Sequence, residues 1–269
     1  SKPDPFPLLE RSGSLGTQSV STRALVTGGS AGLGRAFCEA LSDNGWSVLA
    51  VDRHEASDLP SMDHLTYDLA DPEAPANLLE TLAATGECFD LVIFNAGTGA
   101  TGQFEKLPLD AQLKVLRLNA EAPMILAAGL VREGVMKSSS RMLFIGSLST
   151  FTAYPGAAAY AASKDALAVY ARSIRKPFAR LGIQVACAFP GPLRTTHAER
   201  FAPEGADPSK RMAPERAASE ILKRLFNGRT AITIGGGNRL AAMAGRLFPR
   251  ASAFAMRQTI YRKLHRVRW

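Results

Sequence analysis

The sequence predicts an α/β protein, a single domain built on a doubly wound parallel sheet of about seven strands. Three observations support this prediction. Short apolar runs alternate with longer helical segments along most of the chain. A glycine-rich turn joins the first apolar run to the first helix. At 269 residues and 46% hydrophobic content, the chain can bury one large core, and no internal repeat is evident.

The expected elements follow one another in regular order. Strands are predicted where short runs are rich in Val, Leu, Ile and Phe, at 23–27, 47–51, 64–67, 90–94, 141–145, 183–189 and 231–234. Helices are predicted from the glycine turn to residue 45, and at 72–84, 109–132, 157–180 and 214–227. We expect Pro123 to kink the long helix and Pro214 to lie in the first turn of the last one.

The chain divides into three parts. Residues 1–22 are rich in Pro, Ser and Gly and are expected to form a flexible arm. Residues 23–238 form the predicted domain, and residues 239–269 a basic, amphipathic extension. The extension contains no Asp or Glu but has Arg239, Arg246, Arg250, Arg257, Arg262, Lys263, Arg266 and Arg268, so it accounts for the whole net charge of +8.

Composition also argues against several classes of protein. The 3 cysteines are widely spaced, which favours reduced core thiols over a disulfide framework, and the 4 histidines show no paired spacing for a metal. No apolar run approaches the roughly 18 residues that span a bilayer, and no signal peptide is visible, so a cytoplasmic location is expected. No nucleic-acid-reading module is apparent.

The glycine turn is typical of a nucleotide site. It runs from Gly28 to Gly34, between the strand that ends at Thr27 and a helix. Gly28 allows the tight turn, Gly32 lets the backbone approach a pyrophosphate, and Gly34 lets strand and helix pack closely. The N–H groups at the start of the helix are then available to phosphates.

Acidic residues after the second and third strands suggest which nucleotide binds. Asp52 lies 24 residues after Gly28, near the distance at which a carboxylate binds an adenosine ribose. A carboxylate there favours NAD, whereas Arg53 or Arg35 would instead hold the 2′-phosphate of NADP. Asp68, followed by Leu69, is placed to accept from an adenine amino group.

A tyrosine and a lysine four residues apart predict proton-transfer chemistry. Tyr160 and Lys164 share one face of the helix 157–180. A phenol has a reference pKa of about 10, and a fixed ammonium nearby favours the phenolate. Ser147 lies thirteen residues before Tyr160, at the end of an apolar run, and provides a second hydroxyl. One tunable acid and one hydrogen-bond donor suffice when hydride moves at carbon and a proton at oxygen.

Taken together, these motifs resemble the short-chain dehydrogenase/reductase family. The matching features, in order, are Thr27-Gly28-x-x-x-Gly32-x-Gly34, Asn95-Ala96-Gly97, Asn119, Ser147, Tyr160-x-x-x-Lys164 and Pro190-Gly191. They span about 25 to 235. The resemblance implies a Rossmann-type domain that binds a nicotinamide cofactor and interconverts secondary alcohols and ketones, usually as a homodimer or homotetramer.

The resemblance also implies roles for individual residues. Tyr160 would be the general acid/base, Ser147 would orient the substrate oxygen, and Lys164 would lower the tyrosine pKa and bind the nicotinamide ribose. Asn119 would hold a water that links Lys164 to solvent. The cofactor-binding residues would be Thr27, Gly28, Ser30, Gly32, Leu33, Gly34, Asp52, Arg53, Asp68, Leu69, Asn95, Ala96, Gly97, Tyr160, Lys164, Pro190, Gly191 and Thr195. Thr196 is an equally plausible hydrogen-bond donor to the cofactor in place of Thr195.

The substrate side is less sharply defined. The segment 193–212 is expected to be a mobile lid, because Pro203, Gly205 and Pro208 prevent a continuous helix. Residues 98–104 and 148–155 would line the rest of the pocket. The alternatives to an NAD-linked dehydrogenase are an NADPH-dependent ketoreductase of biosynthesis acting on acyl or lipid-like substrates, and a non-catalytic regulator that binds the cofactor.

The C-terminal extension departs from the family pattern. Phe254, Ile260, Tyr261, Leu264 and Val267 approximate helical spacing, with basic residues between them. Such a helix packs on its own domain or on a second subunit, or it lies on an anionic membrane or an acidic partner.

Overall fold

The computed structural model describes residues 22–54, 62–152, 154–202, 207–259, 261 and 267–269. Its centre is a seven-stranded parallel sheet in the order β3-β2-β1-β4-β5-β6-β7. The strands are β1 Arg23–Thr27, β2 Ser47–Asp52, β3 Asp63–Thr66, β4 Phe89–Phe94, β5 Met136–Ile145, β6 Gln184–Phe189 and β7 Ala231–Thr233. The order reverses between β1 and β4, which confirms the predicted doubly wound sheet.

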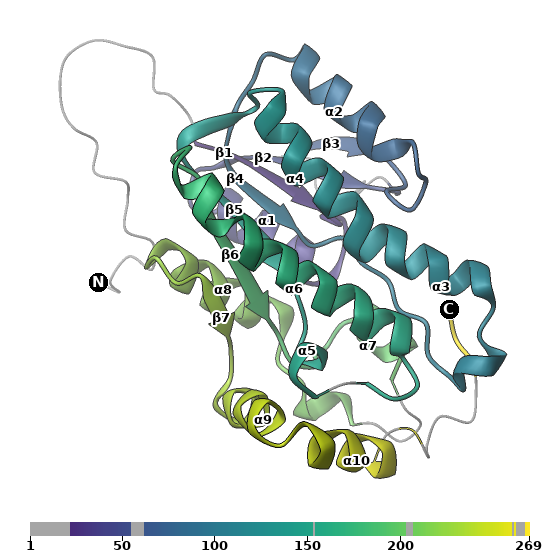
Figure 1. Ribbon diagram of the computed structural model, residues 1–269. Helices are drawn as coiled ribbons and strands as arrows, with labels where there is room; N and C mark the ends of the chain where they lie inside the picture. The colour runs from purple at the N-terminus through teal and green to yellow at the C-terminus, as the bar shows by residue number, and fades with distance from the viewer. Residues whose placement is uncertain (1–21, 55–61, 153, 203–206, 260, 262–266) are drawn as a thin grey trace.

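Helices cover both faces of the sheet (Figure 1). They are α1 Gly32–Ser42, α2 Ala74–Ala84, α3 Leu109–Leu116, α4 Ala122–Arg132, α5 Ser149–Thr152, α6 Ala158–Ala179, α7 Thr196–Arg200, α8 Pro214–Phe226, α9 Gly236–Leu247 and α10 Pro249–Thr259. In the described part of the chain, no helix is both long and apolar enough to span a membrane.

Alternating side chains along each strand build two cores. In β1, Ala24 and Val26 face the core formed with α1 and α8, whereas Leu25 faces the core formed with α2, α4 and α6. Successive residues of a strand point to opposite faces, so a strand buried on both sides is apolar throughout. This explains why the central strands β1, β2, β4 and β6 appear in the sequence as apolar runs.

The long helix predicted at 109–132 is interrupted. A π-helical segment, Arg117–Glu121, separates α3 from α4 and contains Asn119. The kink predicted at Pro123 is therefore replaced by a wider turn just before it, and Pro123 lies in the first turn of α4. The reason is that the proline ring would clash with the carbonyl of Asn119, four residues earlier, in an α-helix.

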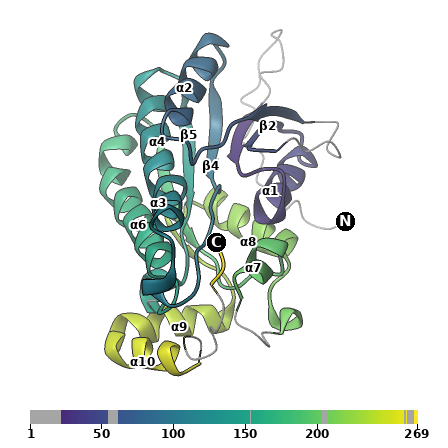
Figure 2. The ribbon, with the colours of Figure 1, turned by 90° about the vertical axis from the view of Figure 1, so that its right-hand side faces the viewer.

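The C-terminal region also differs from the prediction. Two helices, α9 and α10, follow β7, and they lie together at one end of the molecule (Figure 2). The amphipathic helix expected from Phe254 to Val267 ends at Thr259, and Val267 lies outside it, next to the bridge residue Arg268. Ile260, Arg262, Lys263, Leu264 and Arg266 lie outside the described residues, as do Pro203 and Gly205 of the predicted lid.

Candidate active site

The glycine turn forms a cradle between β1 and α1. Gly28 and Gly32 have φ angles of +70° and +55°, which favour glycine. A side chain on Gly34 would clash with the main-chain oxygen of Gly28. Ala31, the residue before α1, offers no side-chain cap, so the first N–H groups of this helix remain available. These features fit the phosphates of a dinucleotide.

The ends of β1 and β4 are tied together beside this turn. The Thr27 hydroxyl accepts hydrogen bonds from the backbone N–H groups of Asn95 (3.0 Å) and Ala96 (3.1 Å). The Asn95 amide donates to the carbonyls of Thr27 and Gly28, both at 3.1 Å. Asn95 therefore holds the shape of the turn from inside.

Asp52 lies at the end of β2, facing the turn. Its Oδ2 accepts from the hydroxyl and the N–H of Ser30, at 2.5 and 3.1 Å. Its Oδ1 accepts from the N–H of Arg53 at 2.7 Å, and the Arg53 side chain is exposed. Arg35 forms an ion pair with Glu39 at 2.8 Å. Of the two cations considered for a 2′-phosphate, Arg53 is thus adjacent to Asp52, while Arg35 pairs along its own helix.

Of three other predicted cofactor residues, one has an exposed side chain and two have buried side chains. Asp68 is exposed, accepts from the N–H of Ala70 at 3.0 Å and lies 3.7 Å from the ammonium of Lys114. The side chains of Leu33 and Leu69 are buried in the two cores. Only the backbones of these leucines can therefore contact a ligand.

Tyr160 and Ser147 meet through their hydroxyl groups. Tyr160 lies near the start of α6, and Ser147 follows β5, so the two elements bring them together. Burial raises the pKa of the Tyr160 phenol, and its hydrogen bond with Ser147 opposes that rise. The Ser147 oxygen also accepts from the N–H of Ser149 at 3.2 Å. The contribution that opposes this rise comes from Ser147, and the lowering expected from Lys164 stays a prediction.

Lys164 lies one turn further along α6, with its side chain buried. Its ammonium donates to the carbonyl of Ile145 at 2.8 Å. Burial lowers its pKa to about 8, and the neighbouring Cys187 acts in the opposite direction. A Cβ on Gly97 would lie 3.4 Å from this ammonium, so the glycine leaves room beside it.

Asn119 is buried and held on three sides. Its Oδ1 accepts from the N–H of Thr98 at 2.8 Å, and its amide donates to the Thr98 carbonyl at 2.9 Å and to the Ser163 hydroxyl at 3.0 Å. Both amide hydrogens are thus used within the protein. The main-chain carbonyl of Asn119 cannot accept the usual α-helical hydrogen bond, because Pro123, four residues later, has no N–H.

The segment after β6 closes over the glycine turn. The Pro190 carbonyl accepts from the N–H of Leu148 at 3.3 Å, and Gly191 packs against the side chain of Asn238. Thr195 caps α7 by accepting from the N–H of Ala198 at 3.1 Å. A Cβ on Gly32 would lie 3.3 Å from the Thr195 methyl group. The predicted lid therefore contacts the phosphate cradle, with Thr196 exposed at the start of α7.

Two side chains outside the predicted set border the substrate side. The ring of Phe201, at the end of α7, lies against Gly99. The ring of Tyr154 meets that of Tyr160 edge-on, with centroids 6.5 Å apart. Both lie within segments that the sequence predicted for the pocket, but aromatic character alone did not distinguish them from core residues.

A C-terminal strap, residues 267–269, also reaches this side. Thr101 and Arg268 form an antiparallel bridge, with N–H···O distances of 2.8 and 2.9 Å. Val267 packs against Gly102 and joins an apolar cluster that includes Tyr160. The Arg268 guanidinium donates to the carbonyls of Arg200 and Ala202. The strap and Arg200 line a pocket of about 270 Å³.

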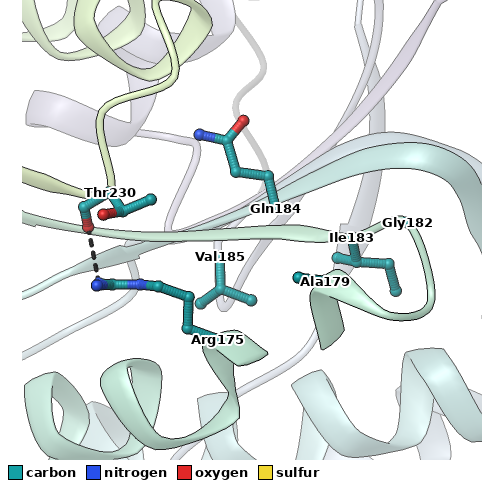
Figure 3. Close-up of a pocket in the computed structure, with 7 residues that line it drawn as sticks. All are labelled: Arg175, Ala179, Gly182, Ile183, Gln184, Val185 and Thr230. Carbon is teal, nitrogen blue, oxygen red and sulfur yellow. Dashed lines mark hydrogen bonds between the residues drawn. The ribbon is translucent and has the colours of Figure 1, made fainter. Parts of the chain in front are cut away.

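A second pocket, of about 300 Å³, lies elsewhere, where α6 ends and β6 begins (Figure 3). Arg175 crosses it and donates to the carbonyl of Thr230 at 3.1 Å. The pocket contains none of the predicted site residues, which lie at the carboxyl ends of the strands. In open α/β sheets, ligands bind at that carboxyl end.

Comparison with known proteins identifies the family. Residues 22–205 match the family model described as short chain dehydrogenase. This match covers more than half of the chain, and the protein belongs to this family of oxidoreductases.

Three individual relatives share between 22% and 29% sequence identity with this chain. The chain is 29% identical over 225 residues to 1-deoxy-11-beta-hydroxypentalenate dehydrogenase of Streptomyces exfoliatus, covering 78% of this chain and 82% of the relative. It is 28% identical over 179 residues to the 3-oxoacyl-[acyl-carrier-protein] reductase FabG of Salmonella typhimurium, covering 64% and 73%. A short chain dehydrogenase from Burkholderia cenocepacia, solved with NADP, shares the fold, with a TM-score of 0.73, 22% identity and coverage of 88% and 97%.

Proposed function

We propose that the protein is an NAD(P)-dependent oxidoreductase that interconverts a secondary alcohol and a ketone (EC 1.1.1). The observation that carries this proposal is the convergence of Ser147, Tyr160 and Lys164 at the carboxyl end of β5, beside Gly97. A bound nicotinamide would supply or accept the hydride, so the protein need handle only a proton and the position of one oxygen.

Tyr160 would exchange that proton with the substrate oxygen, and Ser147 would hold the oxygen in place. The raised pKa of Tyr160 keeps its phenol protonated at neutral pH, which suits donation to a ketone. For alcohol oxidation the phenol must first lose its proton. A protonated Lys164 near it would stabilise the resulting phenolate.

Lys164 requires a route by which protons reach solvent. We propose that the main-chain carbonyl of Asn119, to which Pro123 offers no N–H, accepts a water beside Lys164. The π-helical segment turns this part of the backbone away from regular α-helical bonding. The Asn119 side chain then acts as a brace, because its amide already binds Thr98 and Ser163.

Asp52 supports NAD as the cofactor. Its carboxylate is part of the glycine cradle and would accept from the ribose hydroxyls, in exchange for one bond to Ser30. It would also repel a 2′-phosphate. The N-terminus of α1 would bind the pyrophosphate, as the missing side-chain cap suggests.

An NADPH-dependent ketoreductase is the second candidate. The exposed guanidinium of Arg53, next to Asp52, favours it, since this group is suited to a 2′-phosphate. The similarity to a 3-oxoacyl-[acyl-carrier-protein] reductase also favours a carbonyl substrate on an acyl chain. A non-catalytic regulator is the weakest candidate, because it would not need the hydrogen bond between Ser147 and Tyr160.

We further propose that the protein forms a homodimer through α3, α4 and α6. These helices expose the apolar side chains of Leu109, Leu113, Leu116, Ile125 and Val169. Charged residues of both signs lie among them, namely Asp110, Lys114, Arg117, Glu121, Asp165 and Arg172. A surface with both signs can pair with a second copy of itself across a twofold axis.

Tyr160→Phe tests the mechanism, because it removes the transferable proton with little change in shape. We expect kcat to fall by roughly 10²–10⁴-fold on any confirmed substrate. Tyr67→Phe is the matched control, because its hydroxyl bonds Thr81 of α2 at 2.7 Å. Retained turnover in Tyr160→Phe would refute the assigned role.

Side-by-side fluorescence titration with NADH and NADPH tests the choice of cofactor. Tighter binding of NADH supports Asp52 as the ribose ligand, and Asp52→Ala should then reduce the preference. Tighter binding of NADPH would favour the ketoreductase, and Arg53→Ala should then weaken the binding of NADPH. Binding of neither nucleotide would overturn both candidates.

A further inference from the structure

The helices α9 and α10 carry a surface that combines exposed apolar side chains with cations. We call it the α9–α10 face. Its apolar side chains are between 54% and 65% exposed: Leu240, Met243, Leu247, Phe248 and Phe254. Its exposed cations are Arg239, Arg246, Arg250 and Arg257.

This face is turned outward by the way α9 packs. Ala242 and Gly245 are buried, and a side chain on Gly245 would clash with the main-chain oxygen of Phe151 in α5. Leu240, Met243 and Leu247 are three and four residues apart and lie on the opposite side of the helix. The small side of α9 therefore docks on the domain, and the large side chains face away from it.

The position of the two helices agrees with this. Figures 1 and 2 both show α9 and α10 at the lower end of the molecule, below α6. Both helices contact α5, which begins two residues after Ser147. The α9–α10 face thus lies at the end of the molecule that carries the candidate site.

Its charge has one sign. The sequence contains no Asp or Glu after Glu220. Arg246 stacks 4.4 Å from the centre of the Phe151 ring, and Arg239 donates to the Thr233 carbonyl, so both guanidinium groups are held at the base of the face. A second copy of this face would bring cation against cation, unlike the mixed-sign surface of α3, α4 and α6. A partner that complements this charge is therefore anionic.

We propose that the α9–α10 face binds the surface of an anionic lipid membrane, with both helices lying in the plane of the interface. An acidic soluble protein would match the cations. It would also need an apolar surface that covers the five large apolar side chains of the α9–α10 face. A membrane interface meets both requirements, because acyl chains receive the apolar side chains and lipid phosphates receive the cations. This binding is independent of the function proposed above, and it brings the substrate side close to the bilayer.

Flotation of the full-length protein with lipid vesicles tests the proposal. The probes are vesicles of phosphatidylcholine mixed with phosphatidylglycerol, and vesicles of phosphatidylcholine alone. We expect flotation with the anionic vesicles, at least tenfold weaker binding to the neutral ones, and loss of binding as salt is raised.

Substitutions locate the contact. Leu240→Ser together with Leu247→Ser should weaken binding to the anionic vesicles roughly 100-fold. Leu181→Ser is the matched control, because Leu181 is a leucine of similar exposure (54%) outside α9 and α10 and should leave binding unchanged. Circular dichroism and light scattering of each variant report folding and oligomeric state.

Several results would overturn the proposal. One is the absence of flotation with the anionic vesicles at low salt. A second is equal flotation of the Leu240/Leu247 variant and the wild type. A third is a change in oligomeric mass of that variant without a change in flotation, which would make the face a subunit interface. Binding to soluble polyglutamate that is as tight as to vesicles, and insensitive to the leucine substitutions, would point instead to an acidic protein.

Discussion

Replacing the buried Lys164 by methionine should make the nucleotide-free protein more stable at neutral pH while abolishing turnover. The lysine side chain is 5% exposed, and its ammonium has one main-chain partner, the Ile145 carbonyl. Burial lowers its pKa from 10.5 to about 8. The folded protein therefore bears a cost for holding this charge at pH 7.

The size of the effect follows from the pKa. Each unit corresponds to about 1.4 kcal/mol, so the shift of Lys164 amounts to roughly 3 kcal/mol of stability at pH 7. Methionine has a similar length and removes the charge, but it also removes the bond to Ile145, which contributes about 1 kcal/mol. The net expectation is a gain of about 2 kcal/mol in the free energy of unfolding.

The gain in the free energy of unfolding should decrease as pH rises. Below pH 8, both folded and unfolded wild-type chains are protonated at Lys164, and the full cost is present. Between pH 8 and 10.5 the folded state loses its proton while the unfolded state keeps it, so the wild type becomes more stable as pH rises. The advantage of the methionine variant should therefore shrink to about zero near pH 10.

Urea denaturation of wild type and Lys164→Met at pH 7 and pH 10 measures this difference. Lys176→Met, on the exposed surface of the same helix, is the control and should show no pH-dependent gap. A variant that is less stable than wild type at pH 7, or a gap that does not change with pH, would refute the reasoning.

Two further predictions concern glycine packing and thiol reactivity. Gly34→Ala should lower the free energy of unfolding by at least ~2 kcal/mol, because its methyl group would clash with backbone, whereas Gly237→Ala, with open space around it, should be neutral or slightly stabilising in thermal melts. Iodoacetamide at pH 8 should label the native protein only at the half-buried Cys88, because burial raises the pKa of Cys38 and Cys187 to about 12. Mass spectrometry reads the labelled site, and rapid modification of Cys187 in the folded protein would contradict its burial.

Much of the fold was predictable from the sequence because its signals are local. Strands β1, β2, β4 and β6 are built around apolar runs, and the glycine turn between β1 and α1 is set by adjacent residues. The approach of Ser147 to Tyr160 was also predictable, since Ser147 follows β5 and Tyr160 lies near the start of the next long helix, α6. Their chemical roles remain predictions.

Other features depend on interactions that local patterns do not reveal. Pro123 marked an interruption of the long helix, but local patterns did not reveal its π-helical form or the bonds of Asn119 to Thr98 and Ser163. The start of α9 was hidden by three consecutive glycines, from Gly235 to Gly237, which are typical of a turn. The contact between Val267 and Gly102 joins positions far apart in the chain.

That last contact has a consequence for the order of folding. Pairing Thr101 with Arg268 closes a very long loop, and its entropic cost is offset only once the sheet already holds both ends near each other. The strap should therefore form after the rest of the domain, and it should be among the first parts to open. During synthesis on a ribosome, the contact of Val267 with the apolar cluster around Tyr160 would form only when nearly the whole domain had left the exit tunnel. Amide exchange at Arg268 that is faster than in β4 would be the signature of this late and separable step.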